Sequence, residues 1–405
     1  MVTVTGATKK EHDQKFMEQR GQVAPVDNSP SISKLKTSFD EAIAHHTSLP
    51  RNERVANSRN AREVVASHVG RNKSGKPIDL LTQNQKLMKA SQGYELNGKD
   101  TISLPSGEGV ETTGLSLSPA HEEGKFNTCP NSKSCKKECL GKTSGGNFMF
   151  GGGKDLEAIK GPRLAHYKKT QAFLRNPKEF AVRLHDEIQS AKTLAEANGN
   201  HLGVRLNVLS DIHPKVYESL MNAHPDVSFY DYTKNNSKPV APNHHLTYSS
   251  TGVTQPVGKN GVEEHIENEH QNWHSMRNKL EQGHNVAMAF SHGKELPTHV
   301  HDEETNTHYP VISGDTHDFR PLDKQPKGSK GVIVGLSRKA ATHSDKSAAA
   351  GSSGFFVHYD PQYKKENGKI VKDESGKPVV QNKIVSIAKQ KRGQINIDND
   401  GNKEE

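Results

Sequence analysis

The sequence predicts an α/β protein whose core is a parallel-sheet partial barrel of the TIM type. Amphipathic helical segments alternate with short apolar runs between about residues 110 and 360. Strands separated by helices form βαβ units, and such units build parallel sheets. The flanking residues 1–100 and 361–405 are polar and charged, so we expect them to be solvated segments on either side of one core.

The expected domain organisation has three parts. Residues 1–100 form a polar, partly disordered arm with short helices, residues 101–360 form the α/β core with a three-cysteine loop, and residues 361–405 form a charged tail. In the arm, residues 34–46 carry an apolar helix stripe of Leu35, Phe39, Ala42 and Ile43. A core of about 250 residues is long enough for one large α/β domain.

The elements of the core follow from periodicity and from turn residues. A strand at 113–118 leads to the cysteines, and helices are expected at 161–175 and 178–198, the second ended by Gly199. Further strands are expected at 204–209, 227–233, 245–249, 285–290 and 331–336, with helices at 80–91, 215–223 and 263–282. Residues 299–304 have an HxH spacing followed by acids, which we interpret as an exposed loop.

Composition and charge narrow the function classes. The chain has 55 basic and 47 acidic residues, a net charge of +8, which is compatible with nucleic-acid contact but does not establish it. No apolar run approaches the length of a membrane span, and the first residues lack the features of a signal peptide. The few, clustered cysteines favour a cytoplasmic protein that contacts no membrane. Nothing in the composition indicates the oligomeric state.

The most informative motif is the cysteine segment. Cys129, Cys135 and Cys139 are the only cysteines in the chain and have the spacing C-x5-C-x3-C. Three thiolates can ligate a [4Fe-4S] cluster and leave its fourth iron open to a cofactor or substrate. Three thiolates and one histidine, His121 or His166, would instead form a closed zinc site. Redox or structural thiols are the remaining alternative.

A glycine-rich stretch follows the cysteines. Residues 141–153 contain six glycines, and Gly141 to Thr143 match the end of a phosphate-binding loop. Position 136, however, is Lys where the first glycine of such a loop belongs. We therefore interpret the stretch as a loop beside the cluster, in which Gly145 and Gly146 let the backbone approach a bound cofactor.

Ligands of parallel α/β folds bind beyond the carboxyl ends of the strands. Ser210 and Asp211 follow the strand that contains Asn207, and Lys234 follows the next strand. We expect Asn207 and Ser210 to bind the cofactor, and Asp211 and Lys234 to take part in catalysis.

A second polar group lies near the last strand of the core. Asp315, His317 and Asp318 place two carboxylates and an imidazole within four residues, a set able to bind a divalent metal or to transfer protons. We expect these three residues to be catalytic. A capped turn with solvated acids is the alternative interpretation.

Six short motifs occur in a fixed order from Cys129 to Leu336. They are Asn127–Pro130, Arg205–Asn207 with Ser210 and Asp211, Pro225–Lys234, Asn285–Ala287, Gly314–Asp318 and Gly331–Leu336. In this order and spacing the chain resembles a protein family of bacteriophages and mobile elements, the gene-product-88-like domain family. The family implies no particular activity.

A more distant likeness is to radical S-adenosylmethionine enzymes. Those enzymes hold a [4Fe-4S] cluster by three cysteines in a loop after the first strand of a partial barrel, and here the strand at 113–118 precedes the cysteines. Their usual spacing is C-x3-C-x2-C with an aromatic residue before the last cysteine, whereas this chain has C-x5-C-x3-C and Glu138. The likeness implies S-adenosylmethionine as the cofactor.

These observations lead to one hypothesis and two alternatives. The leading hypothesis is a cytoplasmic iron–sulfur protein of phage or plasmid type, a radical S-adenosylmethionine-like enzyme whose substrate the sequence does not name. The alternatives are a non-enzymatic zinc module with basic arms that contact nucleic acid, and a structural or host-interaction protein without a catalytic site. Iron and sulfide content separates the first from the second, and cofactor binding separates an enzyme from a binding module.

Overall fold

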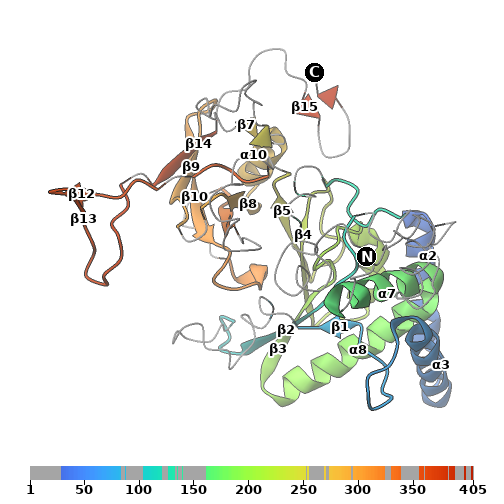
Figure 1. Cartoon of the computed structure of the whole chain (residues 1–405). Helices are drawn as coiled ribbons and strands as arrows, with labels where there is room; N and C mark the ends of the chain where they lie inside the picture. The colour runs from blue at the N-terminus through green and yellow to red at the C-terminus, as the bar shows by residue number, and fades with distance from the viewer. Residues whose placement is uncertain are drawn as a thin grey trace, which may run out of the picture. The chain divides into compact units, whose positions relative to one another are not determined.

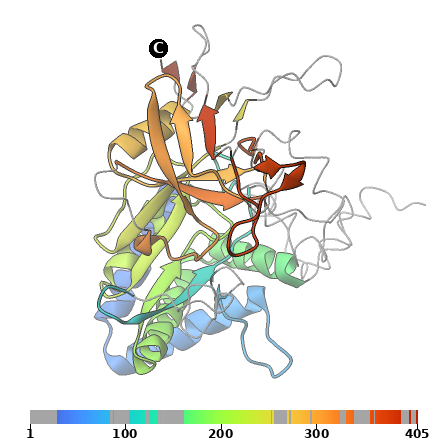
Figure 2. The same cartoon turned by 90° about the vertical axis from the view of Figure 1, so that its left-hand side faces the viewer.

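Figures 1 and 2 show the computed structural model of the protein from two sides. The described residues are 29–83, 87, 104–120, 126–132, 135, 139, 161–251, 253–254, 269–270, 273–292, 295–323, 330–338, 355–359, 361–381, 383–387, 396–397 and 403–404. His121, Gly145 and Gly146, for which the sequence predicts roles, lie outside the described residues.

The chain divides into two compact units. The first comprises residues 1–130, 139–231 and 237–246, and the second comprises residues 131–138, 232–236 and 247–405. Each unit has its own core of buried apolar side chains. The expected division into three parts at residues 100 and 360 stays a prediction.

The main sheet has ten strands in the spatial order β1-β2-β3-β4-β5-β8-β11-β10-β9-β14. In that order their bounds are Leu81–Thr82, Gly109–Leu115, Asn200–Arg205, Ser228–Thr233, His244–Ser249, Val286–Phe290, Ile333–Ser337, Thr307–Ser313, His299–Asp302 and Ile384–Ile387. The pairs β2–β3, β3–β4, β5–β8, β8–β11, β10–β11 and β9–β14 are parallel, whereas β1–β2 and β9–β10 are antiparallel. The sheet is therefore mixed and mostly parallel, which confirms the α/β class.

Six strands of this sheet, from β2 to β11, lie beside one another in the order in which the chain makes them: β2, β3, β4, β5, β8 and β11. The outermost strands are β1 at one edge and β14 at the other, so no closed barrel is detected among the described strands. The partial barrel expected from the sequence stays a prediction.

The first described helices are α2 (Ile32–Ser48) and α3 (Arg51–Val69). The hydroxyl of Ser31 caps α2 by accepting a hydrogen bond from a backbone N–H of the first turn at 3.2 Å. The predicted apolar stripe is confirmed, because Leu35, Phe39, Ala42 and Ile43 are all buried.

Helices α7 (Gly161–Arg175) and α8 (Pro177–Ala197) confirm the two most regular helices of the prediction. Pro177 stands in the first turn of α8, where a missing N–H costs no intrahelical hydrogen bond. Gly199 follows the helix with a φ of 71°, a left-handed conformation that glycine adopts without strain. Figure 1 shows α7 and α8 side by side, and both α2 and α3 also pack against α8.

An aromatic cluster joins α2 to the rest of the first unit's core. The ring centroid of Phe39 lies 5.8 Å from that of Phe173 and 5.6 Å from that of Tyr217, both in edge-to-face geometry. All three side chains are fully buried. We expect a partly ordered arm here, but the structure gives residues 32–69 two regular helices whose apolar faces belong to this core.

The first unit is completed by short helices after β3. Residues Pro214–Tyr217 form the 3₁₀ turn η3, and Glu218–Asn222 form α9, close to the predicted helix at 215–223. The helix expected at 80–91 is wrong at its start, because Leu81 and Thr82 pair with β2 as the edge strand β1.

The second unit contains strands that the sequence analysis misses. Residues 299–302, interpreted above as an exposed loop, form β9, which lies beside β10 as the orange strands of Figure 2 show. The exposed-loop interpretation is wrong because alternation along β9 buries Val300 and Asp302. Asp302 is fully buried and forms an ion pair with Arg277 at 3.1 Å. Acidic composition therefore concealed a half-buried strand.

Helix α10 (Trp273–Glu281) and the 3₁₀ turn η4 (Arg320–Leu322) also belong to the second unit. The helix expected at 263–282 is confirmed over Trp273–Glu281 and is wrong at Glu269–His270, which form β7 and pair with β6 (Val253–Thr254). Part of the expected solvated tail enters the main sheet, since β14 buries Val385 and Ile387 beside β9. The remaining strands form two small pairs, β12 (Lys365–Glu366) with β13 (Lys369–Ile370) and β15 (Asn396–Ile397) with β16 (Lys403–Glu404).

Candidate functional site

The segment that leads from β2 to the first cysteine is fixed by buried hydrogen bonds. The Thr128 hydroxyl donates to the Ser118 carbonyl oxygen at 2.6 Å, and the Thr128 N–H donates to the Ala120 carbonyl oxygen at 3.0 Å. The Ser118 N–H in turn donates to the hydroxyl of Thr170 on α7 at 2.8 Å. Cys129 therefore follows a residue that is held by Ser118 and Ala120, and Ser118 is itself bonded to α7.

The loop after β3 is organised by the side chain of Asn207. Its Oδ1 accepts hydrogen bonds from the Ser210 hydroxyl and the Ile212 N–H, both at 2.9 Å. Its Nδ2 donates to the Ile212 carbonyl oxygen at 3.1 Å. The Asn207 N–H donates to the buried carboxylate of Asp231 at the end of β4, at 2.6 Å. This asparagine thus folds the loop and ties it to the next strand.

The cysteine segment and the loop after β3 lie against each other. The Asp211 N–H donates to the Thr128 carbonyl oxygen at 2.7 Å, and the Cys129 Sγ lies 3.6 Å from the Leu209 carbonyl oxygen. Gly114 in β2 permits this approach, because a Cβ there would lie 2.6 Å from the Val208 side chain. The loop that contains the predicted residues Asn207, Ser210 and Asp211 therefore contacts Thr128 and Cys129 beyond the carboxyl end of β3.

The electrostatics of this region reflect burial. Burial, and after it the charge of Asp231, raise the pKa of the Tyr217 hydroxyl above its ordinary value of 10.0. Burial also lowers the pKa of His166 on α7 to about 4, so its imidazole is neutral at neutral pH. Among the described residues, His166 Nδ1 is buried and has no hydrogen-bond partner.

The three cysteine side chains are half-buried, and none of them forms a disulfide among the described residues. Their sulfur atoms do not form a group within 4.8 Å of one another in the part of the chain that the structure describes, nor do they form such a group with His166. A single zinc ion needs its four ligands around one point. The described conformation therefore does not hold a preassembled zinc site at the cysteines.

In the second unit, the cysteine segment contacts the residues that follow β4. The Asn131 side-chain amide donates to the Asn235 side-chain oxygen, and the Asn235 N–H donates to the Thr233 hydroxyl at 3.0 Å. Lys234, a predicted catalytic residue, is half-buried between these two polar residues. Its place directly after the carboxyl end of β4 matches the sequence-based expectation.

Asp315, His317 and Asp318 form a tight turn after β10 in the second unit. The Asp315 carboxylate accepts a hydrogen bond from the Ser337 N–H at 2.8 Å, which joins the ends of β10 and β11. The buried Arg320 side chain donates to the carbonyl oxygen of His317 and, at 3.3 Å, to that of Asp318. These contacts give the three residues a structural role at the carboxyl end of β10, and a catalytic role stays a prediction.

The HxH spacing at β9 has partners within the protein. The two ring nitrogens of His301 lie 3.0 Å from Asn306 Oδ1 and 3.3 Å from the Ser386 hydroxyl. The ring also stacks on His308, with centroids 4.4 Å apart. Packing between β9, β10 and β14 accounts for this histidine.

One group of metal-ligand side chains is not predicted from the sequence. His46 of α2 and His185 and Asp186 of α8 lie together in the first unit, far from the cysteine segment in sequence. The signal available in the sequence is that His46 continues the apolar stripe of its helix, where a histidine is unusual. No local spacing motif connects residues 46 and 185, so periodicity alone does not pair them.

Comparison with known proteins identifies the family. A family model described as Gene product 88 matches residues 79–358, which is more than half of the chain. The chain belongs to the gene product 88 family. The family match extends beyond both ends of the region from Cys129 to Leu336 that carries the resemblance in sequence, and it includes α7, α8 and the strands from β1 to β11. No curated protein and no solved structure matches the chain.

Membership of the family covers the candidate residues but assigns none of them a role. The match begins after α2 and α3, which therefore lie outside it. None of the helices in the described residues combines the length and apolar character that crossing a bilayer requires.

Proposed function

We propose that this member of the gene product 88 family is a cytoplasmic iron–sulfur protein that acts as a radical S-adenosylmethionine-like enzyme. Cys129, Cys135 and Cys139 would hold the cluster, and S-adenosylmethionine would be the cofactor. When bound, such a cluster supplies an electron and one iron with an open coordination position.

The observation that carries this proposal is the place of the cysteine segment in the strand order. The segment follows β2, the first of six strands that lie side by side in chain order. Its first cysteine lies against the loop after β3, the next strand of the series. Cofactor sites of parallel α/β folds form at these carboxyl ends, which supports a cofactor site at the cysteine segment.

The donor set fits a cluster in number and kind. The chain has three cysteines and no fourth, and the first of them is fixed in place by Thr128. The thiols are not gathered in the described conformation, so the segment has to close around the cluster as it binds. A four-iron cluster is larger than a single ion and needs its thiolates spread over its faces, which suits donors that are not packed around one point.

The residues of the loop after β3 would position the cofactor. Asn207 holds the loop in one conformation through three side-chain hydrogen bonds. Asp211 is buried beside the cysteine segment and would supply a fixed negative charge. Lys234, Asp315, His317 and Asp318 remain candidates because each follows the carboxyl end of a parallel strand.

Purification without oxygen, followed by reconstitution with iron and sulfide, tests the proposal. We expect a brown protein with about four irons and four sulfides per chain, and an electron paramagnetic resonance signal of the reduced cluster that changes when S-adenosylmethionine is added. The Cys135→Ala variant should lose the colour, whereas His45→Gln, a change at an exposed position of α2, should keep it. A colourless wild-type protein with no iron after reconstitution would contradict the proposal.

A second candidate is a zinc module formed by the three thiolates and His166. The buried Nδ1 of His166, without a hydrogen-bond partner among the described residues, favours it, because a neutral imidazole with an available nitrogen is a zinc ligand. The second candidate would replace the first if the protein held one zinc per chain and no iron. The zinc should then be lost in both Cys135→Ala and His166→Gln. Nucleic-acid binding measured at increasing salt concentration would then test whether the basic residues contact nucleic acid.

A further inference from the structure

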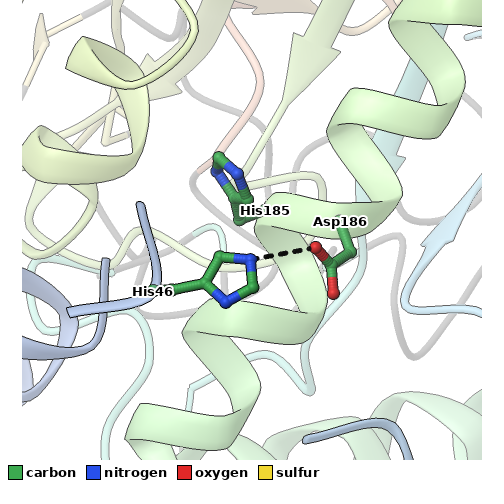
Figure 3. Close-up of side chains that lie close together, drawn as sticks. All are labelled: His46, His185 and Asp186. Atoms are coloured by element: carbon green, nitrogen blue, oxygen red, sulfur yellow. Dashed lines mark ion pairs between the residues drawn. The ribbon is translucent and has the colours of Figure 1, made fainter. Parts of the chain in front are cut away.

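Three metal-ligand side chains converge between two helices of the first unit, away from the residues of the proposed function. His46 comes from the last turn of α2, and His185 and Asp186 come from the middle of α8. One ligand atom of each lies within 4.8 Å of the other two. In Figure 3 the ring of His46 faces the carboxylate of Asp186, and the ring of His185 lies beside both.

These metal-ligand side chains are less exposed than an ordinary ion pair on the protein surface. The His46 side chain is 1% exposed, whereas that of Asp186 is 31% exposed. His46 Nε2 lies 3.3 Å from Asp186 Oδ1, and the two imidazole rings have centroids 5.3 Å apart. The group is therefore closed on the side of the core and reaches solvent through the carboxylate.

The other nitrogen of His46 has a partner that suits a metal ligand. His46 Nδ1 lies 3.0 Å from the side-chain amide nitrogen of Asn57 on α3. Rotation of that amide by half a turn would present its oxygen as an acceptor for Nδ1–H. The Nε2 lone pair would then face Asp186 and be available to an ion, the arrangement that metal-binding histidines use.

One ring nitrogen of His185 is available as a metal ligand. Its Nδ1 is buried and has no hydrogen-bond partner among the described residues. A buried nitrogen without a partner is less stable than one that is satisfied, because it has lost its hydrogen bonds to water. The ring of His224 packs against His185 at a centroid distance of 4.5 Å and limits the rotation of its imidazole. An ion bound through Nδ1 would satisfy a nitrogen that has no partner among the described residues.

We propose that His46, His185 and Asp186 bind one divalent ion of the zinc class. Two imidazoles and one carboxylate are ligands that zinc takes, and three protein ligands leave a fourth position for water. Water can reach this position because the Asp186 side chain is partly exposed. Arg54 is the nearby positive charge that opposes the ion, since it acts on both His46 and His185.

The ion would join parts of the protein that are distant in the chain. His46 and His185 are 139 positions apart, and α2 lies outside the region that the family model matches. The metal would therefore fasten the N-terminal helices to α8. This role is independent of the cysteines and of any cluster that they hold.

Zinc binding to a full-length chain without cysteines tests the proposal. The variant Cys129→Ser/Cys135→Ser/Cys139→Ser removes the thiolates, so that zinc bound at the cysteine segment does not contribute. Titration calorimetry should give one zinc per chain, and zinc should raise the melting temperature of this variant. Cobalt(II) should give the visible absorption of a four-coordinate site without a thiolate band.

Three further substitutions in this background locate the ion. Asp186→Asn and His185→Gln should each lower the zinc affinity by at least about 100-fold, and Asn57→Ala by roughly 10-fold through the orientation of His46. His45→Gln, which removes an exposed histidine one position from His46, should change the affinity less than about twofold. Asp186→Asn retains the size of a partly exposed side chain, so its metal-free melting temperature should equal that of the parent.

The outcome separates the alternatives. Loss of zinc binding in Asp186→Asn and His185→Gln, with the metal-free stability retained in the first, supports the site. Equal zinc affinity in both variants and in the parent would overturn it, as would a parent that takes up no zinc. The test is also independent of the proposed function, because iron content is measured on a chain that retains its cysteines.

Discussion

The protein has two groups of metal-ligand residues: one is close together in sequence but not in space, and the other is close together in space but not in sequence. Cys129, Cys135 and Cys139 fall within eleven positions, yet their sulfur atoms are not gathered within 4.8 Å of one another in the described structure. His46 and His185 are 139 positions apart, yet their ring nitrogens and the Asp186 carboxylate are gathered.

The difference follows from what carries the donors. The histidines and the aspartate stand on long helices whose buried faces pack against each other, so the fold sets their positions before any ion arrives. The cysteines stand on a segment between β2 and α7 that is anchored at Thr128 and Cys129. A ligand must bring their sulfur atoms together, and its binding energy has to cover that ordering.

Of the substitutions considered, removal of the buried Phe39 ring on α2 should have the largest effect on stability and on zinc binding. Phe39 lies two helical turns before His46 on the same buried face and is fully buried. Phe39→Ala should lower the free energy of unfolding by about 3–5 kcal/mol and abolish zinc binding at the helical group, while leaving the thiol chemistry unchanged. Denaturant unfolding measures the first effect and calorimetry the second.

The control for that change is Val55→Ala on α3. Val55 is 53% exposed, so this substitution should change the stability by no more than about 0.5 kcal/mol. If Phe39→Ala costs no more than Val55→Ala, then α2 does not support the helical donors as described.

Thr128→Val tests the anchor of the cysteine segment. The substitution removes the buried hydroxyl that donates to Ser118 and leaves a carbonyl oxygen without that partner, which should cost about 1–3 kcal/mol. It should also reduce the iron bound after reconstitution. Thr193→Val on α8 removes a similar hydroxyl-to-carbonyl bond at an exposed position, so it should cost less than about 0.5 kcal/mol. Equal losses in the two variants would show that Thr128 does not act as an anchor.

Acid should destabilise the first unit through buried histidines. Burial lowers the pKa of His224 to about 3 and that of His244 to about 4, from an ordinary value of 6.5. The unfolded chain therefore takes up protons as the pH falls below about 6.5 while the native protein does not, and stability present above this pH is lost progressively toward pH 4. Each histidine should contribute about 1 kcal/mol of loss at pH 5.5.

Unfolding of the metal-free protein at pH 7.5 and 5.5 measures this dependence. His224→Phe should reduce it, because the phenylalanine ring fills a similar space and does not titrate, while His244 still contributes its share. His45→Gln should leave it unchanged, since His45 is exposed. The same stability at both pH values in the wild-type protein would exclude these histidines as the cause.

The smallest expected effect on stability concerns Cys135. This side chain is half-buried, and Cys135→Ser should change the free energy of unfolding of the metal-free protein by no more than about 0.5 kcal/mol. In the reconstituted protein the same change should remove the cluster. A large loss of stability without metal would mean that the thiol supports the fold itself, and the contrast between the two groups would then be weaker.

The elements that the sequence predicts best are those whose residues repeat with one period. Helices α7 and α8 and the strands β4, β5 and β8 were expected within a few residues of their observed bounds. Strands β9 and β14 were missed because both are only four residues long: His299 and His301 flank the buried Val300 in β9, and β14 lies in a polar, charged tail. Burial there is decided by neighbouring strands, which a local pattern does not contain.

The candidate residues follow the same rule. Ser210 and Asp211 were expected after a strand that contains Asn207, whereas β3 ends at Arg205 and all three residues lie in the loop that contacts Thr128 and Cys129. The contact of Asp315 with Ser337 could not be expected, because it depends on the pairing of β10 with β11. The helical group could not be expected either, since only the packing of α2 on α8 brings its members together.

The packing of α2 on α8 also has a consequence for synthesis of the chain. Helix α2 ends at Ser48, and its partner α8 begins at Pro177, 129 positions later. At roughly 5–20 residues per second, a ribosome needs about 6–26 s to make the intervening chain. During that interval the stripe of Leu35, Phe39, Ala42 and Ile43 has no α8 to cover it. The nascent chain therefore exposes this apolar stripe for seconds before the helix that packs against it has been made.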